Sequence, residues 1–87
     1  MGATPPDDVE LNPFSREVFA VLAEYTAFPW PVLKTQAARA GVAPDKLTPQ
    51  ALGLIVERLA VGVERFTSPE SGHAVRRRLL AMASRSE

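Results

Sequence analysis

The sequence contains no cysteine and only one histidine, one tryptophan and one tyrosine. Without cysteine, the chain has neither a disulfide framework nor thiolate ligands for a metal ion. A single histidine would need carboxylates converging on it from elsewhere, and no spacing in the sequence indicates such a group. We therefore expect no metal site and no cofactor, and we take a cytoplasmic location as the default.

Long apolar runs and catalytic motifs are missing as well. No segment approaches the roughly 20 apolar residues that cross a bilayer, and residues 1–8 lack the basic and apolar regions of a secretory signal. There is no glycine-rich phosphate loop, no GxSxG elbow and no HExxH pair. His73 has no matched nucleophile or acid near it in the sequence. We expect neither a membrane protein nor an enzyme.

Ten Lys and Arg residues balance ten Asp and Glu residues, but the two signs are distributed unevenly. The first 24 residues carry five acids against one base, Arg16, whereas four arginines outnumber two acids from Ser68 onward. We interpret this asymmetry as attraction between the two ends, either within the fold or across a dimer.

The length and composition indicate one small soluble domain. Hydrophobic residues make up 46% and charged residues 23% of the 87 residues, which is ordinary for a globular protein. Residues 1–13 combine prolines with small and acidic residues, so we predict a flexible, extended arm there. Residues 14–87 are predicted to form a single helical domain.

The first two helices are predicted from capping residues and prolines. Ser15 is a good N-cap, and the helix that it begins should end before Pro29. We predict a non-helical corner at Phe28-Pro29-Trp30-Pro31, whose two aromatic side chains plug the end of the bundle. Pro31 suits the first position of a second helix, which should stop at Gly41 with a left-handed cap.

Two more helices begin with the same signal, an N-cap residue followed by proline. Thr48-Pro49 predicts a third helix that runs to about Phe66, and Ser68-Pro69 predicts a fourth that runs to about Ala83. No alternating run of strand length occurs. The predicted fold class is therefore all-α, a small four-helix, bundle-like domain with an extended N-terminal arm.

The third helix is the longest and the most informative. Its core face is predicted to consist of Leu52, Ile55, Val56, Leu59, Val63 and Phe66. On the opposite face, where a helix packed on one side should place polar groups, Leu54 and Val61 lie between two charged rows. One row is formed by Gln50, Glu57 and Glu64, and the other by Arg58 and Arg65.

An apolar strip with charged borders is typical of a helix-helix interface. We therefore predict a non-catalytic interaction or assembly module that forms a homodimer through Leu54, Glu57, Arg58, Val61, Glu64 and Arg65. Pairing two parallel copies of this helix about a two-fold axis brings acidic borders against basic ones, whereas antiparallel pairing brings like charges together. Alternatively, the N-terminal arm covers Leu54 and Val61, or they are simply exposed, as single apolar residues often are.

Arg76, Arg77 and Arg78 raise the question of nucleic-acid binding, because arginines neutralise phosphates. Consecutive residues of a helix point about 100° apart, so these three side chains should fan out instead of forming one patch. Together with zero net charge, this makes nucleic acid a less favoured partner than protein.

One segment favours the nucleic-acid alternative. Thr35-Gln36-Ala37-Ala38-Arg39-Ala40-Gly41-Val42 resembles the first helix and turn of helix-turn-helix regulators, which often read A-x-x-A-G-V there. The resemblance implies a DNA-binding regulator that uses the second to fourth helices. In that family a recognition helix follows almost at once, whereas here Pro44 and Pro49 fall where it should begin. We keep this regulator as the alternative function.

Overall fold

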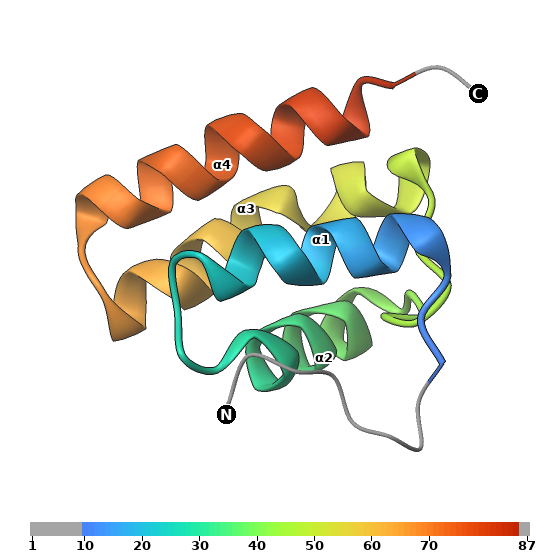
Figure 1. The fold of residues 1–87 in the computed structure, drawn as a ribbon, viewed down its shortest axis with the longest axis horizontal. Coiled ribbons are helices and arrows are strands. Elements are labelled where there is room, and N and C mark those ends of the chain that lie inside the picture. The colour runs from blue at the N-terminus through green and yellow to red at the C-terminus, as the bar shows by residue number, and fades with distance from the viewer. Residues whose placement is uncertain (1–9, 86–87) are drawn as a thin grey trace.

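The computed structural model describes residues 10–85, which form four α-helices and no strand (Figure 1). The helices are α1 (Pro13–Ala23), α2 (Pro29–Ala40), α3 (Pro49–Phe66) and α4 (Pro69–Ala83). The all-α, four-helix prediction is confirmed. Within the same residues, none of the helices has the length and apolar character needed to cross a membrane.

Helix α3 packs against α4 and α2, and α1 packs against the same two helices. In Figure 1, α1 lies in front of α3, with α4 along one side and α2 along the other. The antiparallel pair α3 and α4 forms the most extensive helix-helix contact, followed by α2 and α3. The fully buried side chains of the core come from all four helices and the α2–α3 loop, and the largest include Leu22, Leu33, Leu47, Leu52, Ile55, Leu59 and Leu79.

The helix starts predicted for α3 and α4 are confirmed. Thr48 Oγ1 accepts a hydrogen bond from the backbone N–H of Ala51 at 3.1 Å, and Ser68 Oγ accepts one from Ser71 at 3.3 Å. In each case the following proline occupies the first turn, where its missing N–H is not needed. The chain therefore loses no helical hydrogen bond at either proline.

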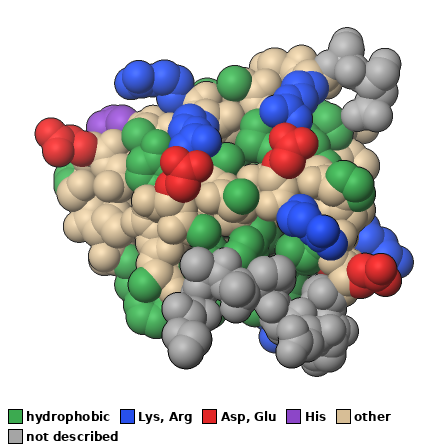
Figure 2. All heavy atoms as spheres, in the orientation of Figure 1, with side chains coloured by type: hydrophobic (Ala, Val, Ile, Leu, Met, Phe, Trp, Pro, Cys, Tyr) green, Lys and Arg blue, Asp and Glu red, His purple; other side chains and the backbone are tan. Residues whose placement is uncertain are grey.

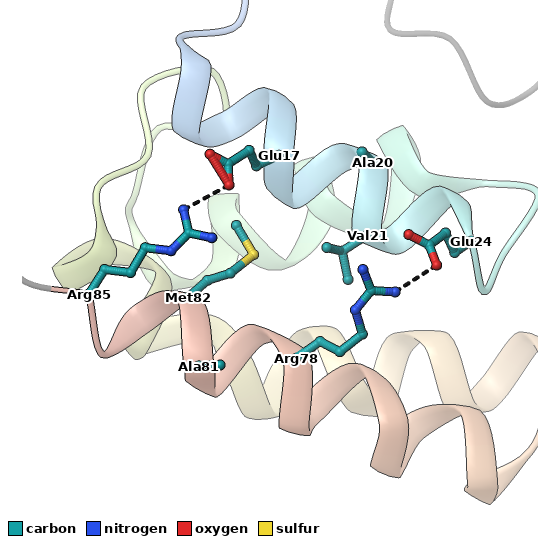
Figure 3. A pocket seen from close by; sticks show the side chains of 8 residues that line it. All are labelled: Glu17, Ala20, Val21, Glu24, Arg78, Ala81, Met82 and Arg85. Carbon is teal, nitrogen blue, oxygen red and sulfur yellow. Dashed lines mark hydrogen bonds and ion pairs between the residues drawn. The ribbon is translucent and has the colours of Figure 1, made fainter.

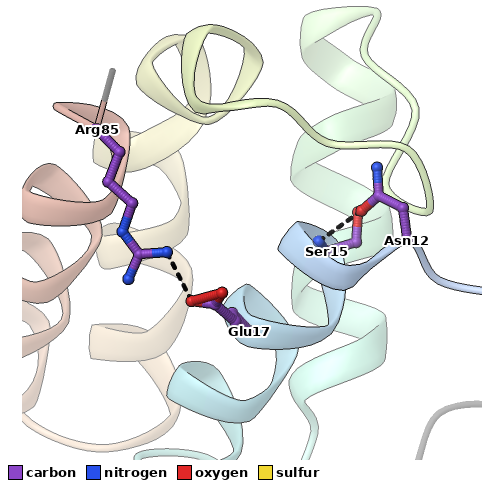
Figure 4. Close-up of polar contacts among 4 residues, drawn as sticks. All are labelled: Asn12, Ser15, Glu17 and Arg85. Atoms are coloured by element: carbon purple, nitrogen blue, oxygen red, sulfur yellow. Dashed lines mark hydrogen bonds and ion pairs between the residues drawn. The ribbon is translucent and has the colours of Figure 1, made fainter. Parts of the chain in front are cut away.

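The predicted start of α1 at Ser15 is wrong, because Asn12 is the N-cap. Asn12 Oδ1 accepts from the Ser15 N–H at 2.7 Å (Figure 4). Ser15 is buried instead, and its Oγ accepts from the N–H of Leu47 at 2.8 Å. Of the predicted arm, residues 1–9 lie outside the described part of the chain, whereas Leu11 is buried in the fold.

The predicted corner before α2 is also wrong. The helix already begins at Pro29, so that both Pro29 and Pro31 lie in its first turn, where neither needs a backbone donor. The other end agrees with the prediction. Gly41 has φ of 75°, and the N–H of Val42 donates to the carbonyl oxygen of Ala37 at 3.0 Å.

Two aromatic residues lie outside the core in which they were expected. Phe66 is 63% exposed at the last position of α3, and Phe28 is exposed beside it, with 6.0 Å between the two ring centroids. Only Trp30 of the predicted aromatic plug packs against the core. Helix periodicity puts Phe66 on the same side of α3 as Val63, but Val63 is the last buried residue of the helix, so Phe66 lies past the core.

Candidate protein interface

Leu54 and Val61 lie on the outward face of α3, as the sequence predicts. Their exposed fractions are 67% and 41%. The neighbouring charged residues of α3, Glu57, Arg58, Glu64 and Arg65, are exposed as well. The structure thus keeps the six predicted interface residues together on one helix face. We call this set of six residues the α3 strip.

The acidic border of the strip faces α4. Arg76 Nε of α4 lies 2.9 Å from Glu57 Oε2, close enough for an ionic attraction, although the geometry is not that of a hydrogen bond. Glu64 adjoins Gly72, where an added Cβ would lie 3.1 Å from Glu64 Cβ. Within residues 10–85, Glu64 itself forms no ion pair. The two glutamates therefore differ, since one is already neutralised by its own chain.

The basic border of the strip faces α2. Arg58 and Arg65 line a groove of about 270 Å³ between α2 and α3, together with Gln36, Arg39, Glu57, Val61 and Gly62. The groove continues towards Pro31 and Phe66 at the end of α3. In the described part of the chain, Arg39, Arg58 and Arg65 form no ion pair. This groove therefore carries three arginines that form no ion pair with any residue the structure describes.

Leu80 extends the exposed apolar surface and was missed by sequence reasoning. It is 47% exposed on α4, one helical turn beyond Arg76 and on the same side of that helix. A signal was present, because Leu80 lies about 100° around the helix from Leu79, on the side away from Val75 and Met82. Leu80 thus adds an exposed leucine to the side of α4 that carries Arg76, the ion-pair partner of Glu57.

A second groove, of about 450 Å³, runs between α1 and α4 (Figure 3). Val21 and Met82 point into it, and two ion pairs cross it. Arg78 Nη1 donates to Glu24 Oε1 at 2.6 Å, and Arg85 Nη1 donates to Glu17 Oε2 at 2.7 Å (Figure 4). These pairs confirm that the acidic and basic parts of the chain attract one another within the fold.

The Arg78 pair also changes the proton affinity of its members. The hydrogen bond from Arg78 lowers the pKa of the Glu24 carboxyl below its ordinary value, which outweighs the opposing effect of desolvation. The pKa of Arg78 is raised, chiefly by its hydrogen bond to Glu24. The guanidinium carbon of Arg78 lies 5.8 Å from the centre of the Tyr25 ring, at a distance typical of a cation-π contact.

The three consecutive arginines of α4 do not form one patch. Arg76 pairs with Glu57 and Arg78 with Glu24, whereas Arg77 is exposed on the opposite side of α4 from the core. On the face shown in Figure 2, acidic and basic side chains lie next to one another.

The connection between α2 and α3 is longer than in a helix-turn-helix motif. Residues 41–48 separate the two helices, more than the three or four residues typical of that motif.

His73 is exposed at the start of α4, and its Nδ1 lies 3.5 Å from Arg76 Nη1. Across residues 10–85, no three His, Cys, Asp or Glu side chains lie close enough together to hold a metal ion.

No family model, curated protein or solved structure matches the chain.

Proposed function

We propose that this protein is a non-catalytic interaction module that forms a homodimer through the α3 strip. The observation that carries the proposal is the exposure of Leu54 and Val61, 67% and 41%, on the outward face of the helix that holds the core together. These two side chains lie seven residues apart, two turns of helix, and therefore point in nearly the same direction. Burial against a second copy would remove both from water.

The charged borders favour parallel α3 helices in the dimer. The acidic border lies on the α4 side and the basic border on the α2 side, as the Glu57–Arg76 pair and the α2–α3 groove show. A two-fold axis parallel to α3 places the α4 side of one protomer against the α2 side of its partner. Opposite charges then face one another, whereas an axis perpendicular to α3 would bring arginines against arginines.

The molar mass in solution tests this proposal. We expect a dimer by sedimentation equilibrium that persists at moderate salt, because the centre of the interface is apolar. Leu54→Glu or Val61→Glu should give monomers, since each places two carboxylates in the apolar centre of the dimer. Phe28→Glu is the matched control, because it charges an exposed apolar residue outside the α3 strip. A wild-type protein that stays monomeric at high concentration would overturn the proposal.

A further inference from the structure

The groove between α2 and α3 has a strong local excess of positive charge. Arg39, in the last turn of α2, faces the same groove as Arg58 and Arg65 of α3. Among the residues that the structure describes, Glu57 is the one acid that lines it, and this carboxylate is already 2.9 Å from Arg76. The groove is therefore suited to an additional carboxylate from outside the protomer.

Glu64 supplies a carboxylate of the kind that the groove lacks. It is exposed, it belongs to the α3 strip, and within residues 10–85 it has no ion-pair partner. The two acids of the strip thus have different roles. Glu57 is engaged inside its own protomer by Arg76, whereas Glu64 is free to contact a second molecule.

Helix geometry brings Glu64 over the groove of a partner. At about 100° per residue, Glu64 lies about 70° to one side of the line through Leu54 and Val61. Gly62, in the groove, lies about 90° to the other side of that line by the same count. A two-fold axis parallel to α3 exchanges these two sides, so each Glu64 approaches the groove of the other protomer.

We infer that the α2–α3 groove is the receptor for Glu64 of a second copy, with Arg65, Arg58 and Arg39 holding the carboxylate. This inference rests on the proposed homodimer, and it names the charged residues that fix the relative orientation of the two protomers. The contact between Glu64 and the α2–α3 groove occurs twice in the dimer, once on each side of the apolar centre. Arginine is suited to this task, because its planar guanidinium binds a carboxylate through two parallel hydrogen bonds.

Charge reversal in separate chains provides the experiment. Glu64→Arg and Arg65→Glu are each expected to weaken the homodimer at least about tenfold in Kd, because each change appears twice and opposes like charges. An equimolar mixture of the two variants should recover a dimer of near wild-type affinity, since both of its grooves then face a residue of opposite charge. Glu70→Arg and Arg77→Glu reverse exposed charges on the outer side of α4 and should leave Kd unchanged.

The outcomes separate the two proposals. A monomeric wild-type protein overturns the homodimer and this inference together. A wild-type dimer whose Kd is unaffected by Glu64→Arg and Arg65→Glu overturns only the role of the groove. Failure of the equimolar mixture to form the heterodimer also overturns only the role of the groove. If Glu64→Arg does not fold by circular dichroism, Glu64→Gln with Arg39→Glu gives the same comparison, and a Kd within twofold of wild type for both would reject the inference.

Discussion

Adding one methyl group at Gly53 of α3 and one at Gly72 of α4 is expected to change the stability in opposite directions. Both glycines lie within helices, where replacing glycine by alanine contributes up to about 1 kcal/mol through helix propensity alone. At Gly53 the nearest atom to an added Cβ is Ala83 Cβ at 3.9 Å, an ordinary van der Waals distance. Gly53→Ala should therefore stabilise the fold by about 0.5 to 1 kcal/mol.

Gly72 occupies a much tighter position, where α4 approaches α3. An added Cβ would lie 3.1 Å from Glu64 Cβ and 3.2 Å from the carbonyl oxygen of Ala60. The carbonyl belongs to the α3 backbone, so it can move away only if the helix shifts. Overpacking of this kind costs about 1 to 3 kcal/mol, more than the gain of about 1 kcal/mol from propensity. Gly72→Ala should therefore destabilise the fold by about 1 kcal/mol, and Gly72→Val by more.

Urea unfolding followed by circular dichroism measures both effects. For a domain of this size the total free energy of unfolding is about 4 to 13 kcal/mol, and 1 kcal/mol shifts Tm by about 4 to 8 °C. The variants should be compared in the Leu54→Glu background, so that self-association does not add to the measured stability. If Gly72→Ala stabilises the protein as much as Gly53→Ala does, the close approach of the two helices is not a constraint and the reasoning is refuted.

Two further changes test polar contacts. Ser15→Ala removes the acceptor of the buried Leu47 N–H and should cost about 1 to 3 kcal/mol in urea unfolding, whereas Ser84→Ala, at an exposed hydroxyl, should change little. The lowered pKa of Glu24 contributes stability that is present above the pKa of the unfolded carboxyl and is lost as pH falls through the lower folded pKa. Arg78→Gln should reduce the fall of the urea midpoint at acidic pH. An unchanged fall would show that the Glu24–Arg78 pair does not contribute to it.

Much of the fold could be predicted because the helix starts are local. Thr48-Pro49 and Ser68-Pro69 combine a side-chain acceptor with a residue that needs no donor, and both begin a helix. Asn12-Pro13 carries the same signal and begins α1, but Ser15 is an equally good cap by its chemistry. Contacts of Asn12 and Ser15 with the α2–α3 loop, more than 30 positions away in the sequence, decide between them.

The direction of a side chain around its helix could be predicted, but its depth in the fold could not. Periodicity correctly placed Leu54 and Val61 outward, and it also placed Phe66 on the core side, where the structure leaves it exposed. Which charged residues of the candidate site are paired depends on the helices that lie beside α3, and periodicity does not specify those helices. The pairing of Glu57 with Arg76 requires α4 beside α3, and the groove around Arg39 requires α2 on the other side.

The central position of α3 limits how the protein can change. The same helix forms the framework on which α2 and α4 pack and displays Leu54 and Val61 to water. A change at Leu59 disturbs the core, and a side chain added at Gly62 would press on Val32, so only the outward positions of α3 can vary without disturbing the interior. In the proposed interface, a shift in binding preference that preserves folding would thus come from the outward side chains of α3 and from groove residues such as Arg39 of α2.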